Sequence, residues 1–285
     1  MVNYMSIVEK NTLRIAFEKA GIQSGDTVLL YSDISCFGKA SDNSPKTLLK
    51  IFYDTLSDLL GKNGTICAPA YYYEYARYGM PYDIKTSPIS NELGLFPKFI
   101  NSLDNSKRSP NPITAITAVG KNADYICEIV NRHSYGEDSA YDRLYKLNSK
   151  IVLLGPQFNN LTFWHYVEYR VGVAHTYNKI YNIPVLYNGK TVFDYTIANV
   201  RYLNKNVEYN FLNHEEWLKV YQPMIDNNTL LISPYLNSSI YMYETCGLFN
   251  LVKDYMYHNP YYLIIPSPNF PFGEIPNDGP KLFNK

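Results

Sequence analysis

Cysteine is scarce in this sequence of 285 residues, and neither sign of charge is in excess. The four cysteines (Cys36, Cys67, Cys127 and Cys246) form no Cys-x-x-Cys pair, which fits reduced thiols rather than a disulfide framework. Twenty-six basic residues match twenty-six acidic ones, so no global field attracts nucleic acid or an anionic membrane. No apolar run reaches the ~18 residues that span a bilayer, and the first residues lack the features of a signal peptide. We therefore expect a cytoplasmic protein without a nucleic-acid or membrane partner.

The composition is otherwise that of a globular protein with a sizeable core. Hydrophobic residues make up 46% of the chain, and 15 glycines and 17 prolines are ordinary numbers for this length. The 29 tyrosines suggest a ligand-binding surface, because a phenol combines a flat apolar body with a polar tip. Asparagine, isoleucine and lysine are plentiful too, so we attribute most of the tyrosines to the base composition of the gene.

Helical and strand patterns alternate through the first 155 residues. Helical patterns cover 13–20, 44–61, 91–102, 122–131 and 141–147, and strand patterns cover 26–31, 65–68, 113–119 and 151–154. Between them, residues 71–90 form a long loop, a length that usually accompanies function. Strands separated by helices predict an α/β fold, with a mostly parallel or mixed central sheet covered by helices.

The pattern changes after residue 175. Segments 183–187 and 191–200 alternate around Asn188-Gly189, which is typical of a hairpin, and helical patterns follow at 214–224 and 243–257. We therefore expect an α/β core over residues 1–175, which carries the active site, and a smaller α+β portion over 176–285 packed on it. No linker separates the two parts, so a single domain is the alternative.

A polar segment follows the first predicted strand. It contains Ser32, Asp33, Ser35, Phe37 and Gly38. Open α/β sheets bind ligands at the carboxyl ends of their strands, where small hydroxyl residues and glycine expose backbone N–H groups to phosphate or carbonyl oxygen. The alternative is a Ser/Asp turn that satisfies only its own backbone.

A second candidate segment precedes the third predicted strand. Arg108 and Ser109 can hold an anionic group, and Asn111 between two prolines offers both a donor and an acceptor. The alternative is a rigid turn with a solvated arginine.

The most specific pattern is a His-x-x-Glu pair at the start of the helix that follows the fourth strand. His165 and Glu168 are three residues apart and share one face of that helix. A carboxylate in this place can orient the imidazole and stabilise its protonated form, and histidine is the usual general base. The alternative is a structural histidine beside a solvated glutamate.

Other chemistries lack their residues. The sequence has no Gly-x-Ser-x-Gly elbow, no basic or histidine neighbour that would activate a cysteine, and no His-x-x-x-His or cysteine pair for zinc. We therefore predict no metal site.

Taken in order, these segments resemble the aminoglycoside 3-N-acetyltransferase family. The matching blocks are 25–32 with Ser35 and Gly38, Gly64-Thr65 with Ala68-Pro69, 94–97, Arg108-Ser109 with Pro112, Gly136 with Ser139 and Arg143-Leu144-Tyr145, 152–155, and Thr162 with His165, Glu168, Tyr169 and Arg170. They span roughly residues 20–265. The resemblance implies an acyl-CoA-dependent N-acyltransferase with His165 as general base, Glu168 as its partner, and coenzyme A as co-substrate.

The same resemblance assigns further residues to ligands. The loop at 32–38 with Arg108, Ser109 and Thr114 is expected to hold coenzyme A, and Tyr71, Asp83 and Asn111 to contact the acceptor. The chain departs from the family at Asn111, where a histidine is usual, at Asp33 in place of a second serine, and at Ala140 in place of proline.

The charge pattern bears on the acceptor. Segments 31–38, 71–90 and 108–115 contain Asp33, Glu74 and Asp83 against Arg77, Lys85 and Arg108. Since each ammonium of a polycation needs a carboxylate when desolvated, these charges favour an acceptor with one amine and an attached anionic nucleotide. The resemblance extends to proteins that acylate nucleotide-linked amino-deoxysugars of surface-polysaccharide biosynthesis, so we expect an acceptor of that class. The alternatives are an aminoglycoside acetyltransferase that confers antibiotic resistance and a non-catalytic sugar or nucleotide binder. The sequence leaves the oligomeric state open, a homo-oligomer included.

Overall fold

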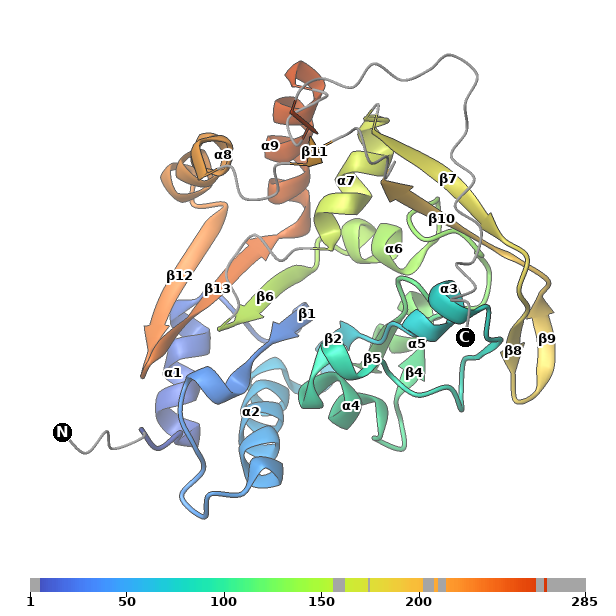
Figure 1. Cartoon of the computed structure of the whole chain (residues 1–285). Coiled ribbons are helices and arrows are strands. Elements are labelled where there is room, and N and C mark those ends of the chain that lie inside the picture. The colour runs from blue at the N-terminus through green and yellow to red at the C-terminus, as the bar shows by residue number, and fades with distance from the viewer. Residues whose placement is uncertain are drawn as a thin grey trace.

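A mixed sheet of seven strands, in the order β12-β13-β6-β1-β2-β5-β4, forms the centre of the molecule (Figure 1). The computed structural model describes residues 6–155, 162–173, 175–201, 208–209, 214–259 and 264–265. The strands of this sheet are β1 (Thr27–Ser32), β2 (Thr65–Pro69), β4 (Lys107–Arg108), β5 (Ile116–Gly120), β6 (Lys150–Leu154), β12 (Leu230–Tyr235) and β13 (Ser238–Glu244).

Three parallel strands lie at the middle of the sheet. Leu29 of β1 pairs with Cys67 of β2 on one side and with Ile151 of β6 on the other. The flanking strands β5 and β13 run antiparallel to β2 and β6. The predicted α/β class with a mixed sheet is therefore confirmed, and the carboxyl ends of β1, β2 and β6 open at one edge.

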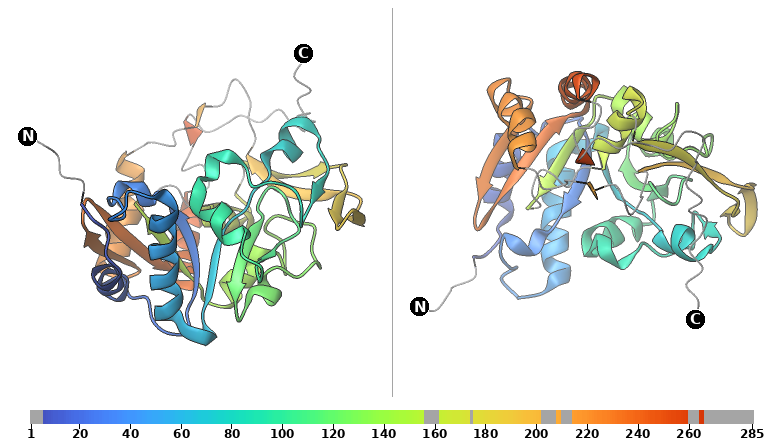
Figure 2. Two further views of the ribbon diagram at one scale, coloured as in Figure 1. Left: turned by 90° about the horizontal axis from the view of Figure 1, so that it is seen from below. Right: turned by 45° about the horizontal axis from the view of Figure 1, so that its top comes forward.

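Helices cover both faces of the sheet (Figures 1 and 2). Along β1, Val28 and Leu30 face one hydrophobic core and Leu29 faces the other, as the strand periodicity requires. The first core lies under α1 (Lys10–Lys19), α2 (Pro45–Leu60) and α4 (Leu95–Asn101). The second lies under α5 (Ala123–Ile126), α6 (Ala140–Lys146), α7 (Phe163–Val171), α8 (His214–Asp226) and α9 (Thr245–His258).

Two of the expected helices are shorter than the sequence predicts. Gly94, at φ 80°, separates a 3-10 turn, η3 (Asn91–Leu93), from α4, so the helix expected over 91–102 is interrupted. Of the helix expected over 122–131, only α5 forms. Two more 3-10 turns, η1 (Ile34–Cys36) and η2 (Gly61–Asn63), follow β1 and α2.

Small sheets flank the central one. The segment 71–90, expected as a loop, contains α3 (Tyr73–Tyr78) and β3 (Tyr82–Asp83). The hairpin at Asn188-Gly189 is confirmed: β8 (Val185–Tyr187) pairs with β9 (Lys190–Phe193), and β8 also pairs with β3. Beyond the hairpin, β10 (Thr196–Arg201) pairs with β7 (Thr176–Tyr181). A further short pair joins β11 (Glu208–Tyr209) to β14 (Ile264–Ile265).

The central sheet crosses the boundary expected near residue 175. Strands β12 and β13 come from the C-terminal portion, yet Ile240 of β13 pairs with Leu154 of β6. None of the described helices is both long enough and apolar enough to span a membrane.

Gly155, at the end of β6, allows the first loop to approach the sheet edge. Its φ is +85°, and a Cβ at this position would collide with Cys36 Sγ and lie 2.9 Å from the carbonyl oxygen of Asp33. Gly172 has a similar φ of +76° but nothing within 4 Å of the same position. We therefore expect Gly155→Ala to lower the free energy of unfolding by about 2–4 kcal/mol, and Gly172→Ala by about 1 kcal/mol. Urea denaturation of both variants measures the difference, and equal losses would contradict the close approach.

Candidate functional site

Helix α7 carries the His-x-x-Glu pair at the open edge of the sheet. It begins after Thr162, whose carbonyl accepts from the N–H of His165, and ends at Gly172 in a left-handed conformation. Phe163, Trp164 and other apolar side chains of the helix are buried in the second core. This packing fixes the helix and leaves the His165 side chain 37% exposed.

His165 and Glu168 form the contact that their spacing predicts. Nδ1 of His165 lies 2.5 Å from Oε2 of Glu168. Because an ionised carboxylate only accepts, Nδ1 donates to Oε2, and in the neutral imidazole the lone pair is then on Nε2. No described residue hydrogen-bonds to Nε2, so this nitrogen can take a proton from a ligand.

Glu168 is fully buried, and three described side chains contact its carboxylate. Its Oε1 lies 2.9 Å from Nη2 of Arg201 on β10 and 3.3 Å from Nε2 of His175, just before β7. Burial alone would raise the pKa of Glu168, but its electrostatic interactions with His165 and with the guanidinium of Arg201, and the hydrogen bonds of His165 and His175, hold that pKa well below its usual value. The carboxylate therefore remains ionised across the physiological range.

A cluster of tyrosine hydroxyls lies beside this pair. The hydroxyl of Tyr141 is 2.7 Å from that of Tyr71 and 3.0 Å from that of Tyr31. Tyr135 packs edge-on against Tyr141, and its ring centroid is 6.5 Å from that of His165. Burial raises the pKa of all four tyrosines, so they act as neutral hydroxyls. Of these, only Tyr71 was expected at the site.

The first loop lines a cavity of about 420 Å³ at the same edge. Ser32, Asp33 and Ser35 lie on its wall, opposite an apolar wall that includes Leu48 and Phe96. The Ser32 hydroxyl is buried and has no hydrogen-bond partner within the described structure. The other two predicted members of this loop lie elsewhere: Phe37 is buried in the first core, and Gly38 approaches the backbone of Ser6.

Arg108 is turned to the backbone rather than to solvent. It is 5% exposed, and its guanidinium donates to the carbonyls of Ala70, Ser87 and Pro88. Ser109 is buried as well, and its hydroxyl accepts from the N–H of Ile116. These contacts hold both ends of the 71–90 segment against β4 and β5, and they satisfy the two side chains with backbone groups.

The remaining predicted residues also make internal contacts. Asn111 donates to the carbonyls of Arg132 and Ile197, and Thr114 donates to that of Ser134. Asp83 accepts from the N–H groups of Gly189 and Lys85; although burial opposes it, these bonds lower the pKa of Asp83. The structure therefore brings His165 and Glu168 together and links Tyr71 to them through Tyr141 and Tyr135, whereas the polar groups of Asp83, Asn111 and Thr114 are engaged with other parts of the protein.

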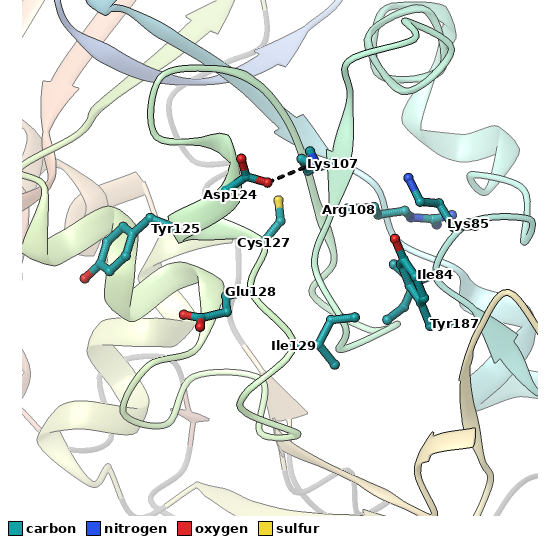
Figure 3. A pocket seen from close by; sticks show the side chains of 10 residues that line it. All are labelled: Ile84, Lys85, Lys107, Arg108, Asp124, Tyr125, Cys127, Glu128, Ile129 and Tyr187. Carbon is teal, nitrogen blue, oxygen red and sulfur yellow. Dashed lines mark ion pairs between the residues drawn. The ribbon is translucent and has the colours of Figure 1, made fainter. Parts of the chain in front are cut away.

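A second cavity, of about 460 Å³, lies beside β4 and β8 (Figure 3). Lys85, Lys107 and Arg108 line it together with Asp124 and Glu128, and Lys107 is paired with Asp124 at 3.0 Å. His165, Glu168 and the first loop are not among its lining residues. Its lining carries three cationic side chains against two carboxylates, and it does not include the candidate base. Over the described residues, no group of His, Cys, Asp and Glu side chains could hold a metal ion.

Sequence reasoning missed the residues that complete the Glu168 site. His175 and Arg201 lie 7 and 33 residues beyond Glu168, without a motif that links them. They meet the carboxylate only because β10 pairs with β7, with Arg201 opposite Thr176. The hairpin pattern around Asn188-Gly189 gave no signal for this second pairing.

A family model described as aminoglycoside 3-N-acetyltransferase matches residues 29–231. The chain is 26% identical over 209 residues to the SPbeta prophage-derived aminoglycoside N(3')-acetyltransferase-like protein YokD of Bacillus subtilis, covering 65% of this chain and 72% of that protein. It is 25% identical over 187 residues to aminoglycoside N(3)-acetyltransferase III of Salmonella, covering 60% of this chain and 64% of that protein.

Solved structures share the fold. AAC-IIIb, in a binary complex with CoASH, superposes with a TM-score of 0.73 at 17% identity, over 92% of this chain and all of the other. AAC-VIa bound to sisomicin gives 0.72 at 18% identity, over 89% and 99%.

The ionised Glu168 should contribute to stability above its ordinary pKa of 4.5. Because the pKa is lowered in the folded state, this contribution is complete above that pH and is lost as the pH falls toward the folded value. Glu168→Gln leaves Arg201 without its charge partner, so we expect a loss of about 3–5 kcal/mol near pH 7 that shrinks below pH 4.5. Urea denaturation at several pH values measures it.

Glu18→Gln is the matched control for that measurement. Glu18 pairs with Arg14 at 3.0 Å, but its side chain is 47% exposed. Loss of this pair should lower the free energy of unfolding by less than about 1 kcal/mol at every pH. If Glu168→Gln behaves like the control, the buried pair does not carry the assigned charge.

Proposed function

The chain belongs to the aminoglycoside 3-N-acetyltransferase family, whose members are acyl-CoA-dependent transferases, and on that premise we propose that it moves an acyl group from acyl-CoA to an amine of an aminoglycoside. The single observation that carries the proposal is the His165–Glu168 contact. It joins a half-exposed imidazole to a fully buried carboxylate at 2.5 Å, at the sheet edge where α/β folds bind ligands.

We assign His165 as the general base. An ammonium group is unreactive, so the amine must lose a proton as its nitrogen attacks the thioester carbonyl. Nε2 of His165 takes that proton, and Glu168 stabilises the imidazolium through Nδ1. Acyl transfer is complete when the nitrogen–carbonyl bond has formed, the carbon–sulfur bond has broken, and the thiolate of coenzyme A has taken the proton from Nε2 of His165.

The cavity beside the first loop has the chemistry to hold the donor. Its apolar wall of Leu48, Leu49 and Phe96 suits the pantetheine arm, and the unpartnered Ser32 hydroxyl offers one hydrogen bond. The N–H groups of Ile34 and Ser35 begin the short η1 turn and therefore have no partner within it. We assign these two donors to the oxyanion that develops on the thioester carbonyl.

The charge argument for a nucleotide-linked acceptor loses its basis once the contacts are known. Arg77 is paired with Glu92 at 2.6 Å, and Arg108 and Asp83 are committed to the backbone. Bonds to backbone groups do not cancel the charges of Arg108 and Asp83, but they engage the polar atoms that the charge argument assigned to the acceptor. The names of the relatives then support an aminoglycoside as the acceptor.

Removal of the base should affect chemistry more than binding. We expect His165→Gln to lower kcat by roughly 10²–10⁴-fold while the Kd for coenzyme A stays within a few-fold of the parent value. Thiol release and calorimetric titration measure the two quantities. His258→Gln is the control, because that histidine caps the exposed end of α9 and contacts the carbonyl of Asp254. Turnover of His165→Gln near that of the control would remove His165 from the mechanism.

The acceptor is tested with a panel of amines. We expect thiol release from acetyl-CoA with gentamicin- or kanamycin-like compounds and much slower release with nucleotide amino sugars. The reverse ranking would restore the polysaccharide reading. Binding of an aminoglycoside without turnover of any acyl-CoA would identify a non-catalytic binder.

A further inference from the structure

The two oxygens of Glu168 face different groups. Oε2 contacts His165, while Oε1 contacts Arg201 at 2.9 Å and His175 at 3.3 Å. Glu168 and His175 are completely buried, and the Arg201 side chain is 17% exposed. The oxygen that does not contact the candidate base therefore has a cation and a hydrogen-bond donor of its own.

A buried carboxylate needs a compensating charge, and there are two ways to supply it. Either His165 holds a proton permanently, or a cation from another element balances the carboxylate. A permanently protonated His165 cannot accept a proton from an amine. The salt bridge from β10 provides the second solution, because Arg201 stays charged at any physiological pH.

We propose that Arg201 and His175 are positioning residues that balance the Glu168 carboxylate and so keep His165 a neutral base. The inference rests on the proposed function for its kinetic readout. Arg201 supplies the compensating charge, and His175 donates from Nε2 to the same oxygen. Both interactions draw charge density away from Oε2, which weakens the hold of Glu168 on a proton at His165.

Other elements packed around the pair contribute little charge. From the 133–135 segment, Tyr135 faces His165 as a neutral phenol, and burial lowers the pKa of His133, which packs against Tyr169 at 4.7 Å. On α7 itself, Arg170 is directed to Asp142 at 2.8 Å. Within the described chain, the cation in contact with Glu168 is thus Arg201.

The test is the pH dependence of kcat/KM in Arg201→Gln, with one acceptor used throughout so that its own titration is common to all variants. We expect the acidic limb to move to higher pH by about one unit or more, since an opposite charge at this range shifts a pKa by about 1–3 units. At pH values below this acidic limb, kcat/KM of Arg201→Gln should be about tenfold lower than that of the parent protein. At alkaline pH it should approach the parent value. Arg201→Lys keeps the charge and should leave the limb near its parental position.

Nuclear magnetic resonance titration of the His165 imidazole provides a readout that does not depend on turnover. The midpoint should rise in Arg201→Gln by the same amount as the kinetic limb. His175→Phe removes the second donor and should shift both readouts in the same direction by a smaller amount. If Arg201→Gln does not fold, the same two measurements on His175→Phe test the inference.

Arg170→Gln is the matched control, because it removes an arginine from the catalytic helix that does not touch Glu168. The acidic limb of its kcat/KM profile and the titration midpoint of its His165 should stay at the parental values. An equal loss of activity at every pH in Arg201→Gln, with an unmoved His165 midpoint, would overturn the inference. Absence of acyl transfer by the parent protein would instead refute the proposed function and leave the titration to decide the charge balance.

Discussion

The burial of one carboxylate, Glu168, constrains much of the surrounding structure. A charge removed from water must be matched by a counter-charge and by hydrogen bonds to both oxygens. Here the partners come from α7, from the turn before β7 and from the end of β10. The antiparallel ribbon of β7 and β10 must therefore reach α7, and it does so in the register that sets Arg201 opposite Thr176.

The central sheet determines where the His165–Glu168 pair lies. The parallel strands β1, β2 and β6 end at the same edge and deliver Ser32, Tyr71 and the approach to α7 there. Tyr141 from α6 joins Tyr31 and Tyr71 through their hydroxyls, so the segment after β2 and the helix are fixed to β1. The cavity beside the first loop and the His165–Glu168 pair thus lie on one frame, as the proposed roles of donor site and general base require.

The sequence predicted those features that depend on local periodicity. The strands around β1, β2 and β6, the hairpin at Asn188-Gly189 and the His165–Glu168 contact all follow from spacings of two to four residues. The sequence did not predict the long-range contacts. Strand β13 pairs with β6, β3 pairs with β8, and Arg201 contacts Glu168, and no sequence pattern connects these segments. Arg108, Asp83 and Asn111 show the same limit, because a polar side chain in a loop motif does not reveal that backbone groups will satisfy it.

The late position of β13 in the chain has a consequence for biosynthesis. The described partners of Glu168 have been synthesised once the ribosome passes Arg201, yet β6 still lacks its neighbour β13, and α7 lacks the helix α9 that packs against it through Tyr166 and Phe249. At that stage the nascent chain contains His165, Glu168, His175 and Arg201, but it lacks the strand and the helix that pack against β6 and α7. Because β13 and α9 are translated late, the site gains its full support only after the final third of the chain has emerged and packed against β6 and α7.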